Sequence, residues 1–285
     1  MKDTIIRSDK MIVHVNALGA ELKSVEMDGF EYLWQGQKDI YPRTSPTLFP
    51  IVGRFLSDTY YVDDRAYQMP LNGMAMDENF KCILHEDNRA AFQLTANERL
   101  HAVYPFDFRL TVTYTAEANT LRVDDQVENL GDSAMPFCIG CHTAYNWPLT
   151  EGDAPEEYRL RFEKEEDLDS FNPFGWTQPF VQGNLRPLSH DLFANYTRSL
   201  TGIQSDWIQL ESVKNGRAVR IHRKDFPYLA IWTLPTPDAK LICLEPCTGV
   251  QAGNHGALHL EDRDGALILQ PKETWNKGFM LEFLD

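Results

Sequence analysis

Two residues with useful acid/base chemistry each stand at the end of an apolar, strand-like run. His142 closes the run that begins at Phe137, and Glu245 closes the run that begins at Leu241. A strand buried on one face can hold such a side chain rigidly at the edge of a cavity. An imidazole and a carboxylate held in this way can deliver one proton to a substrate and remove another. We therefore predict that His142 and Glu245 are a catalytic pair.

Each member of this pair also has an ordinary structural interpretation. His142 fits a hydrogen-bonded histidine of the core, and Glu245 fits an outward-facing residue of an edge strand. If Glu245 is instead buried among its apolar neighbours, the loss of hydration raises the pKa of its carboxyl group.

Aromatic and polar residues near His142 favour a carbohydrate site. Tyr145, Asn146 and Trp147 follow it closely. Aromatic faces pack on the C–H surfaces of sugars, while polar side chains meet the hydroxyls. Tyr145 and Trp147 are therefore predicted to bind substrate. Arg54, which follows a stretch stiffened by prolines, offers five hydrogen-bond donors for sugar hydroxyls or a carboxylate and is predicted to bind substrate. The alternative interpretation of Arg54 is a surface ion pair.

The cysteine pattern indicates free thiols. The five cysteines are an odd number in a chain with no signal-like segment. Cys138 and Cys141 form a C-x-x-C, but they lie in a strand pattern and no second C-x-x-C follows. We interpret Cys138 and Cys141 as buried structural thiols and expect neither a metal site nor a cofactor.

Composition argues against several classes of partner. The chain has 285 residues, a net charge of −15 at pH 7 and no basic stripe, which argues against nucleic acid and anionic membranes. Residues 1–10 are polar and charged, and no apolar run approaches the roughly 20 residues of a membrane span. We expect a cytoplasmic protein with a small-molecule substrate. Composition gives no indication of an oligomeric state.

Alternation of apolar and polar residues dominates the chain and predicts strands. It is clear over 108–115, and Asn215-Gly216 between two alternating runs is typical of a hairpin. A second hairpin is predicted for 60–68 across Asp63-Asp64. Helical periodicity is nearly absent, apart from one short helix expected over 189–196 with Ser189 as N-cap.

This pattern predicts an all-β fold with very little helix, a large antiparallel β-sandwich or barrel. No linker or repeat divides the chain, so residues 1–285 are expected to form a single domain. Residues 167–187 are rich in proline, glycine, asparagine and aromatics, which predicts a long surface loop, either a functional lid or a plain connection.

Seven short segments together resemble the aldose 1-epimerase (galactose mutarotase) superfamily, in particular its shorter, lactose-operon-associated bacterial branch. The resemblance runs nearly end to end. The segments are Gly19–Ser24, Glu31–Gly36, Leu48–Arg54, Tyr104–Phe108, Ile139–His142, Ile231–Thr233 and Cys243–Pro246.

The resemblance implies a β-supersandwich with an open sugar-binding face and cofactor-free interconversion of the α and β anomers of an aldose. It makes Glu245 the general base at the anomeric hydroxyl and His142 the general acid at the ring oxygen. Arg54 matches a substrate-binding arginine. A sugar of the aldohexose class would be the partner.

One motif departs from the family pattern. A His-Gly-Phe-Ala-Arg-like stretch normally supplies a second histidine, but here Asn72 takes the place of the histidine and Met76 that of the arginine. Asparagine donates hydrogen bonds but does not carry a proton near neutral pH. Met76 brings no charge, which disfavours a phosphorylated sugar. Two hypotheses follow: an epimerase that uses His142 and Glu245, with Asn72 binding substrate, or a carbohydrate-binding or regulatory protein with little turnover.

Overall fold

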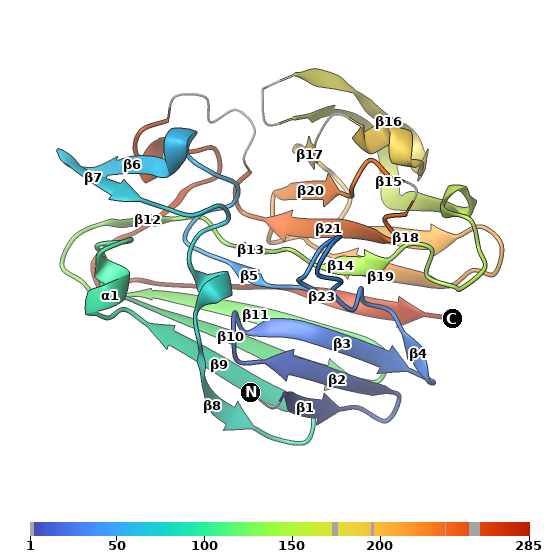
Figure 1. The fold of residues 1–285 in the computed structure, drawn as a ribbon, viewed down its shortest axis with the longest axis horizontal. Helices are drawn as coiled ribbons and strands as arrows, with labels where there is room; N and C mark the ends of the chain where they lie inside the picture. Colours follow the sequence, from blue (N-terminus) through green and yellow to red (C-terminus); the bar gives the residue numbers. More distant parts are fainter. Residues whose placement is uncertain (1–2, 173–175, 195–196, 237, 251–256) are drawn as a thin grey trace.

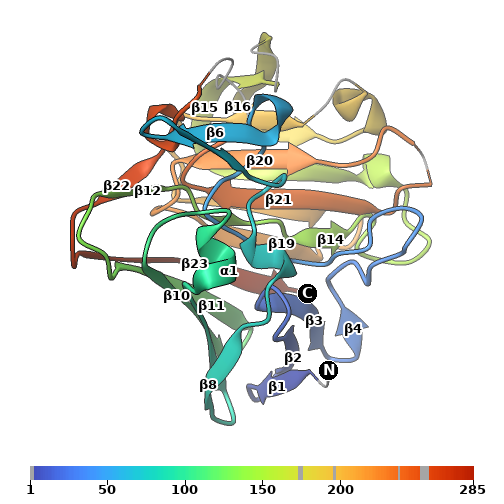
Figure 2. The same cartoon turned by 60° about the vertical axis from the view of Figure 1, so that its left-hand side comes forward.

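The protein is almost entirely β. The computed structural model describes residues 3–172, 176–194, 197–236, 238–250 and 257–285. In this part of the chain every pairing between named strands is antiparallel. Figures 1 and 2 show one long, curved sheet with a smaller sheet against one end. The predicted all-β, antiparallel architecture is confirmed.

The large sheet is continuous along a path of thirteen strands, with two further strands attached at its side. Its path is β5 (Thr47–Leu48), β13 (Gly140–Cys141), β21 (Leu241–Cys247), β20 (Tyr228–Trp232), β17 (Arg198–Leu200), β15 (Tyr158–Phe171), β18 (Trp207–Ser212), β19 (Ala218–His222), β23 (Thr274–Leu284), β11 (Thr120–Asn129), β10 (Phe108–Glu117), β9 (Arg89–Thr95) and β8 (Lys81–His85). The two attached strands are β14 (Ala144–Asn146), which pairs with β21, and β16 (Thr177–Pro187), which pairs with β15.

Smaller sheets and short helices complete the fold. The strands are β1 (Thr4–Arg7), β2 (Met11–Asn16), β3 (Glu21–Met27) and β4 (Phe30–Glu31) in one sheet, β6 (Thr59–Val62) with β7 (Arg65–Gln68), and β12 (Met135–Phe137) with β22 (Leu267–Leu269). The helices are α1 (Glu98–His101) and the 3-10 helices η1 (Leu56–Asp58), η2 (Ala75–Asp77), η3 (Pro155–Glu157), η4 (His190–Phe193) and η5 (Leu260–Asp262).

Strand alternation builds the core. On β10, Phe108, Leu110 and Val112 are buried on one face, and they pack in a continuous core with Val13 and Val25 of the four-stranded sheet. Strand β1 contacts β9 and β10, so the small sheet covers this end of the large one (Figure 1). Burial of this apolar area, at about 25 cal/mol per Å², is the main stabilising term.

Both predicted hairpins are confirmed. Strands β18 and β19 pair across Asn215-Gly216, where Gly216 has φ +81°. Strands β6 and β7 pair across Asp63-Asp64, with Asp63 at φ +51°. The local turn chemistry was sufficient in both cases because glycine, asparagine and aspartate tolerate positive φ.

Two local predictions need correction. Residues 167–187 are not a long loop: 167–171 belong to β15 and 177–187 to β16, which pair with two register shifts. Pro179 and Pro187 suggested a loop, but β16 pairs only with β15 among the described residues, and a strand edge without partners tolerates proline. Near Ser189 the structure has the 3-10 helix His190–Phe193, without a side-chain cap from Ser189; Tyr196 lies outside the described residues.

The one-turn helix α1 was not predicted. Asn97 caps this one-turn helix, since its side chain accepts from the N–H groups of Arg99 and Leu100. Among the described residues, no helix is both long and apolar enough to cross a membrane.

Candidate active site

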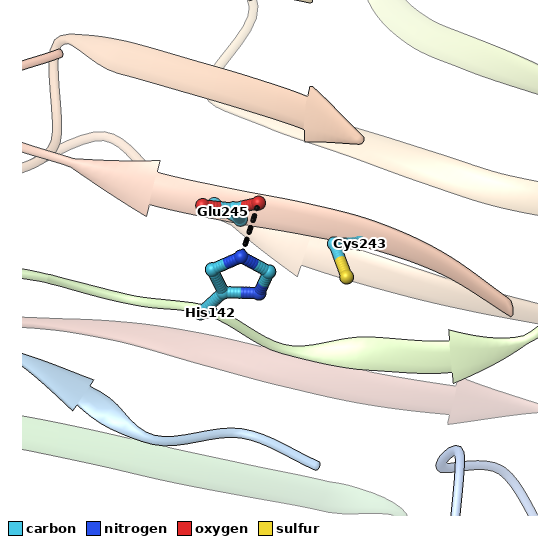
Figure 3. A group of neighbouring side chains, drawn as sticks. All are labelled: His142, Cys243 and Glu245. Atoms are coloured by element: carbon cyan, nitrogen blue, oxygen red, sulfur yellow. Dashed lines mark ion pairs between the residues drawn. The ribbon is translucent and has the colours of Figure 1, made fainter. Parts of the chain in front are cut away.

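His142 and Glu245 lie directly opposite each other on neighbouring chain segments. Gly140 on β13 faces Cys247, and Ala144 on β14 faces Cys243, so this register sets His142 against Glu245. Nε2 of His142 is 3.4 Å from Oε1 of Glu245 (Figure 3). Glu245 lies inside β21, which continues to Cys247, and His142 lies between β13 and β14. The structure therefore brings together two predicted catalytic residues that are 103 positions apart in the chain.

Close approach of the segments depends on Gly140. A Cβ atom at this position would lie 2.6 Å from Sγ of Cys247 and 2.9 Å from the carbonyl oxygen of Pro246. Any side chain there would push β13 away from β21 and separate His142 from Glu245. The glycine is thus needed for the geometry of the pair.

The pair lies at the base of a cavity of about 420 Å³, within the range of roughly 300–1,000 Å³ typical of small-molecule sites. Residues of the next two strands lie beside the pair in the sheet: Glu245 faces Ala230 on β20, and Ala230 faces Ser199 on β17. The small alanine leaves space above the sheet. The residues lining the cavity are Tyr41, Val52, Gly53, Leu71, Asn72, Met76, His142, Thr197, Ser199, Ala230, Trp232, Glu245 and Val250.

Two aromatic residues position the imidazole. The hydroxyl of Tyr41 lies 3.0 Å from Nδ1 of His142, and the two rings stack with centroids 5.1 Å apart. Trp232 meets the imidazole edge-on at 5.8 Å. The indole of Trp34 donates to the backbone carbonyl of Tyr41 at 2.7 Å. These contacts leave Nε2 as the ring nitrogen that faces Glu245.

Burial changes the proton affinity of both predicted catalytic groups. Loss of hydration lowers the pKa of His142 to about 4 and raises the pKa of Glu245 well above its ordinary value, because a buried site disfavours the charged form of each group. The pair therefore holds one proton over a wide pH range. Two groups that share one proton can donate that proton to a substrate and accept another proton from it.

Asn72 and Met76 both line the cavity, so the two departures from the family motif lie at the site itself. Asn72 has φ +63°. Its Oδ1 accepts from the N–H of Gly53 at 2.7 Å, and its own N–H donates to the carbonyl of Gly53 at 2.7 Å. The Nδ2 group of Asn72 is therefore the part of its side chain that can donate a hydrogen bond to a ligand. Among the described lining residues other than His142 and Glu245, none carries a charge.

Arg54 is not among the residues that line the cavity. Its Nε lies 3.3 Å from Oδ1 of Asp58, and half of its side chain is exposed. This is the surface ion pair that the sequence left open as the alternative. The neighbouring Gly53 has φ +78° and faces the cavity in its place.

Tyr145 and Trp147 lie in the hydrophobic core and do not line the cavity. Alternation on β14 explains Tyr145: Ala144 packs with Cys243 on the face nearest the site, so the next side chain points the other way. The indole of Trp147 donates to the carbonyl of Pro155 at 3.1 Å. The sequence identified aromatic residues near His142 but did not define their direction.

Sequence reasoning missed Tyr41, Trp232, Ser199 and Cys243 as members of this region. Trp232 carried a usable signal, because it alternates with Ile231 on a strand next to the one that bears Glu245. No sequence signal marked Tyr41, because it lies in an irregular segment 101 residues before His142. Ser199 needed the pairing of β17 with β20.

The chain matches the family model described as Aldose 1-epimerase over residues 2–282. It belongs to the aldose 1-epimerase family. Protein LacX, in plasmid and chromosomal forms from Lactococcus lactis subsp. lactis, is 29% identical over 296 residues, which cover 98% of this chain and 99% of each relative. The resemblance seen in the sequence is thus confirmed.

Solved structures of similar proteins agree with this family and with its mutarotase-like fold. A galactose mutarotase-like protein from Lactobacillus casei ATCC 334 is 29% identical with a TM-score of 0.92, covering 99% of this chain and 100% of that one. A galactose mutarotase related enzyme from Lactobacillus acidophilus is 26% identical with a TM-score of 0.91, covering 99% and 97%.

Proposed function

We propose that this member of the aldose 1-epimerase family interconverts the α and β anomers of a neutral aldose. The observation that carries the proposal is the opposition of His142 and Glu245, which lie 3.4 Å apart and both line the cavity. Anomer exchange needs one proton taken and one delivered on neighbouring oxygens. A pair that shares a single proton supplies both in one step.

The pair carries one proton before and after ring opening. The reacting form is the one in which the shared proton has passed from Glu245 to Nε2 of His142, 3.4 Å away. Glu245, as carboxylate, then takes the proton of the anomeric O1 hydroxyl, while Nε2 of His142, as imidazolium, protonates the ring oxygen. The C1–O5 bond breaks and C1 becomes an aldehyde. Rotation about C1–C2, followed by the reverse transfers, closes the ring on the other face. The ring-opened state leaves Glu245 and His142 both neutral, which is the state that burial favours.

Tyr41 is assigned the role of orienting residue. In the imidazolium both ring nitrogens carry protons, so Nδ1–H donates to the hydroxyl oxygen of Tyr41 at 3.0 Å. That hydrogen bond keeps one proton on Nδ1, and Nε2 then carries the proton that is transferred.

The lining supports a neutral sugar of the aldohexose class. Trp232 offers an apolar face for ring C–H groups, and Tyr41, Ser199 and Asn72 offer hydroxyl and amide groups. The described lining residues include no lysine or arginine that could pair with a phosphate. We expect free galactose or glucose to turn over faster than the corresponding 6-phosphates.

The test is polarimetry on freshly dissolved α-D-galactose and α-D-glucose with wild type and Glu245→Gln. We expect the wild type to accelerate the decay of optical rotation and Glu245→Gln to lose this acceleration, while calorimetric sugar binding stays within several-fold. Glutamine keeps the size of the side chain and cannot take a proton. Full activity in Glu245→Gln would exclude Glu245 as the base.

A second candidate function is a carbohydrate-binding or regulatory role with little turnover. The observation that favours it is Asn72, whose Oδ1 is occupied by the Gly53 N–H and which carries no proton near neutral pH. In that case folded wild type binds sugar in calorimetric titration but leaves the rotation decay at its uncatalysed rate. Absence of binding at millimolar sugar would exclude this role.

A further inference from the structure

Cys243 lies beside the catalytic pair and has no part in the proposed proton transfers. It is two residues before Glu245 on β21, so both side chains leave the strand on the same face. One ligand atom each from His142, Cys243 and Glu245 lie within 4.8 Å of one another (Figure 3). The thiol is fully buried and is not among the residues that line the cavity.

We propose that His142, Cys243 and Glu245 form a binding site for a Zn²⁺-like divalent cation, and that cation and sugar exclude each other. The metal site stands on these three donors alone. Only the accompanying inhibition of turnover rests on the proposed epimerase function.

The donor set selects the class of metal. Imidazole nitrogen, thiolate sulfur and carboxylate oxygen are the ligands of Zn²⁺, with bonds of about 2.0–2.3 Å. Ca²⁺ and Mg²⁺ prefer oxygen alone. The separation of 3.4 Å between Nε2 of His142 and Oε1 of Glu245 is close to one edge of a tetrahedron with such bonds. A small shift of the thiol toward the metal completes the set.

Charge and hydrogen bonding fit the same site. A divalent cation balances one thiolate and one carboxylate, which removes the cost of burying two anions. The Tyr41 hydroxyl, 3.0 Å from Nδ1, can accept the N–H of the ring nitrogen that does not bind metal. Histidine ligands usually donate their second ring nitrogen in this manner.

The fourth coordination position would open into the cavity, because His142 and Glu245 line it while Cys243 lies behind them. Water would take this position in the metal-bound state. The metal would occupy Nε2 and the carboxylate, which are the atoms that the proposed reaction needs. Bound metal therefore blocks both sugar binding and proton transfer.

The site is tested with Co²⁺ as a spectroscopic probe on the full chain carrying Cys82→Ala. This substitution removes the exposed thiol, which could bind metal at the surface. We expect a near-ultraviolet sulfur-to-cobalt charge-transfer band at one equivalent of Co²⁺, lost on addition of Zn²⁺. Adding Cys243→Ala should abolish the band. Adding Cys247→Ala, a buried cysteine on the same strand but outside the cluster, should leave it.

The absence of a band in the Cys82→Ala protein, or its persistence with Cys243→Ala, would overturn the proposal. If Cys243→Ala fails to fold, Cys243→Ser is measured instead, and His142→Asn must also remove the band. In the activity arm, Zn²⁺ should inhibit the Cys82→Ala protein at least tenfold more strongly than the protein with Cys243→Ala. A cobalt band without any epimerase activity would retain the metal site and reject the proposed function.

Discussion

At the scale of single residues, the proposed mechanism makes the hydroxyl of Tyr41 the group that orients His142 for proton transfer. Hydrogen bonds to charged groups contribute about 1.5–3 kcal/mol. Tyr41→Phe keeps the stacked ring and removes the acceptor 3.0 Å from Nδ1. We expect kcat to fall by about 10- to 100-fold, since about 1.4 kcal/mol is tenfold in rate, with little change in KM.

A matched control for this variant is Tyr60→Phe. Tyr60 is buried, its hydroxyl donates to the carbonyl of Val103, and neither residue lines the cavity. This variant should alter the melting temperature and leave kcat unchanged. Equal effects of the two substitutions on kcat would assign Tyr41 a purely structural role.

The shared proton predicts a bell-shaped pH dependence. Below the His142 pKa of about 4 the pair gains a second proton, so the base is lost. Above the raised pKa of Glu245 the pair loses its last proton, so the acid is lost. We expect kcat/KM, corrected for the uncatalysed rate, to be level between these limits. An acidic limb at or above the ordinary histidine value of about 6.5 would contradict the assignment.

At the scale of elements, the loop that carries Asn72 forms one wall of the cavity. The side chain and the backbone of Asn72 both hydrogen-bond to the backbone of Gly53. The adjacent Gly73 packs so closely against Phe49 that a Cβ atom on it would clash with the carbonyl oxygen of Phe49. This part of the wall is therefore held by close contacts of the chain, and we predict that Asn72, which lines the cavity, has both a structural and a ligand-binding role.

Asn72→Ala and Asn72→Asp separate these two roles. Alanine leaves the buried Gly53 N–H without its acceptor, which costs about 1–3 kcal/mol of stability. Aspartate keeps an acceptor oxygen and loses the Nδ2 donor. We expect Asn72→Ala to lower the melting temperature and Asn72→Asp to retain it while raising KM. An unchanged KM in Asn72→Asp would show that the amide does not contact sugar.

At the scale of the whole molecule, an acidic residue is buried inside the fold. Asp125 on β11 lies between Val123 and Val127 on the same buried face of the strand. Burial, reinforced by the charge of Asp124, raises the pKa of Asp125 to about 8. The folded protein thus binds a proton that the unfolded chain releases near pH 4. Between those values the contribution of Asp125 to stability falls as pH rises.

Asp125→Asn should remove this dependence. The stability of the variant relative to wild type should increase between pH 5 and pH 8, by at most about 1.4 kcal/mol per pH unit. Denaturant unfolding at several pH values measures the difference. Asp132→Asn is the control, because Asp132 is exposed and paired with Lys272 at the surface. Parallel stability curves for wild type and Asp125→Asn would contradict the buried, protonated carboxyl.

The sequence by itself determined the local features of this protein. Alternation marked the strands around 108–115, and Asn215-Gly216 marked a hairpin, because side-chain direction and turn conformation depend on neighbouring residues. The apolar runs that end at His142 and Glu245 likewise showed that both side chains leave buried strands.

Only the tertiary structure decided which distant residues meet. Strand register set His142 opposite Glu245, turned Tyr145 into the core, and placed Cys243 beside the pair. A shift of one residue in that register would reverse every side chain on the strand. Tyr41 reaches the imidazole from an irregular segment 101 residues away, and no local pattern specifies a contact of that kind.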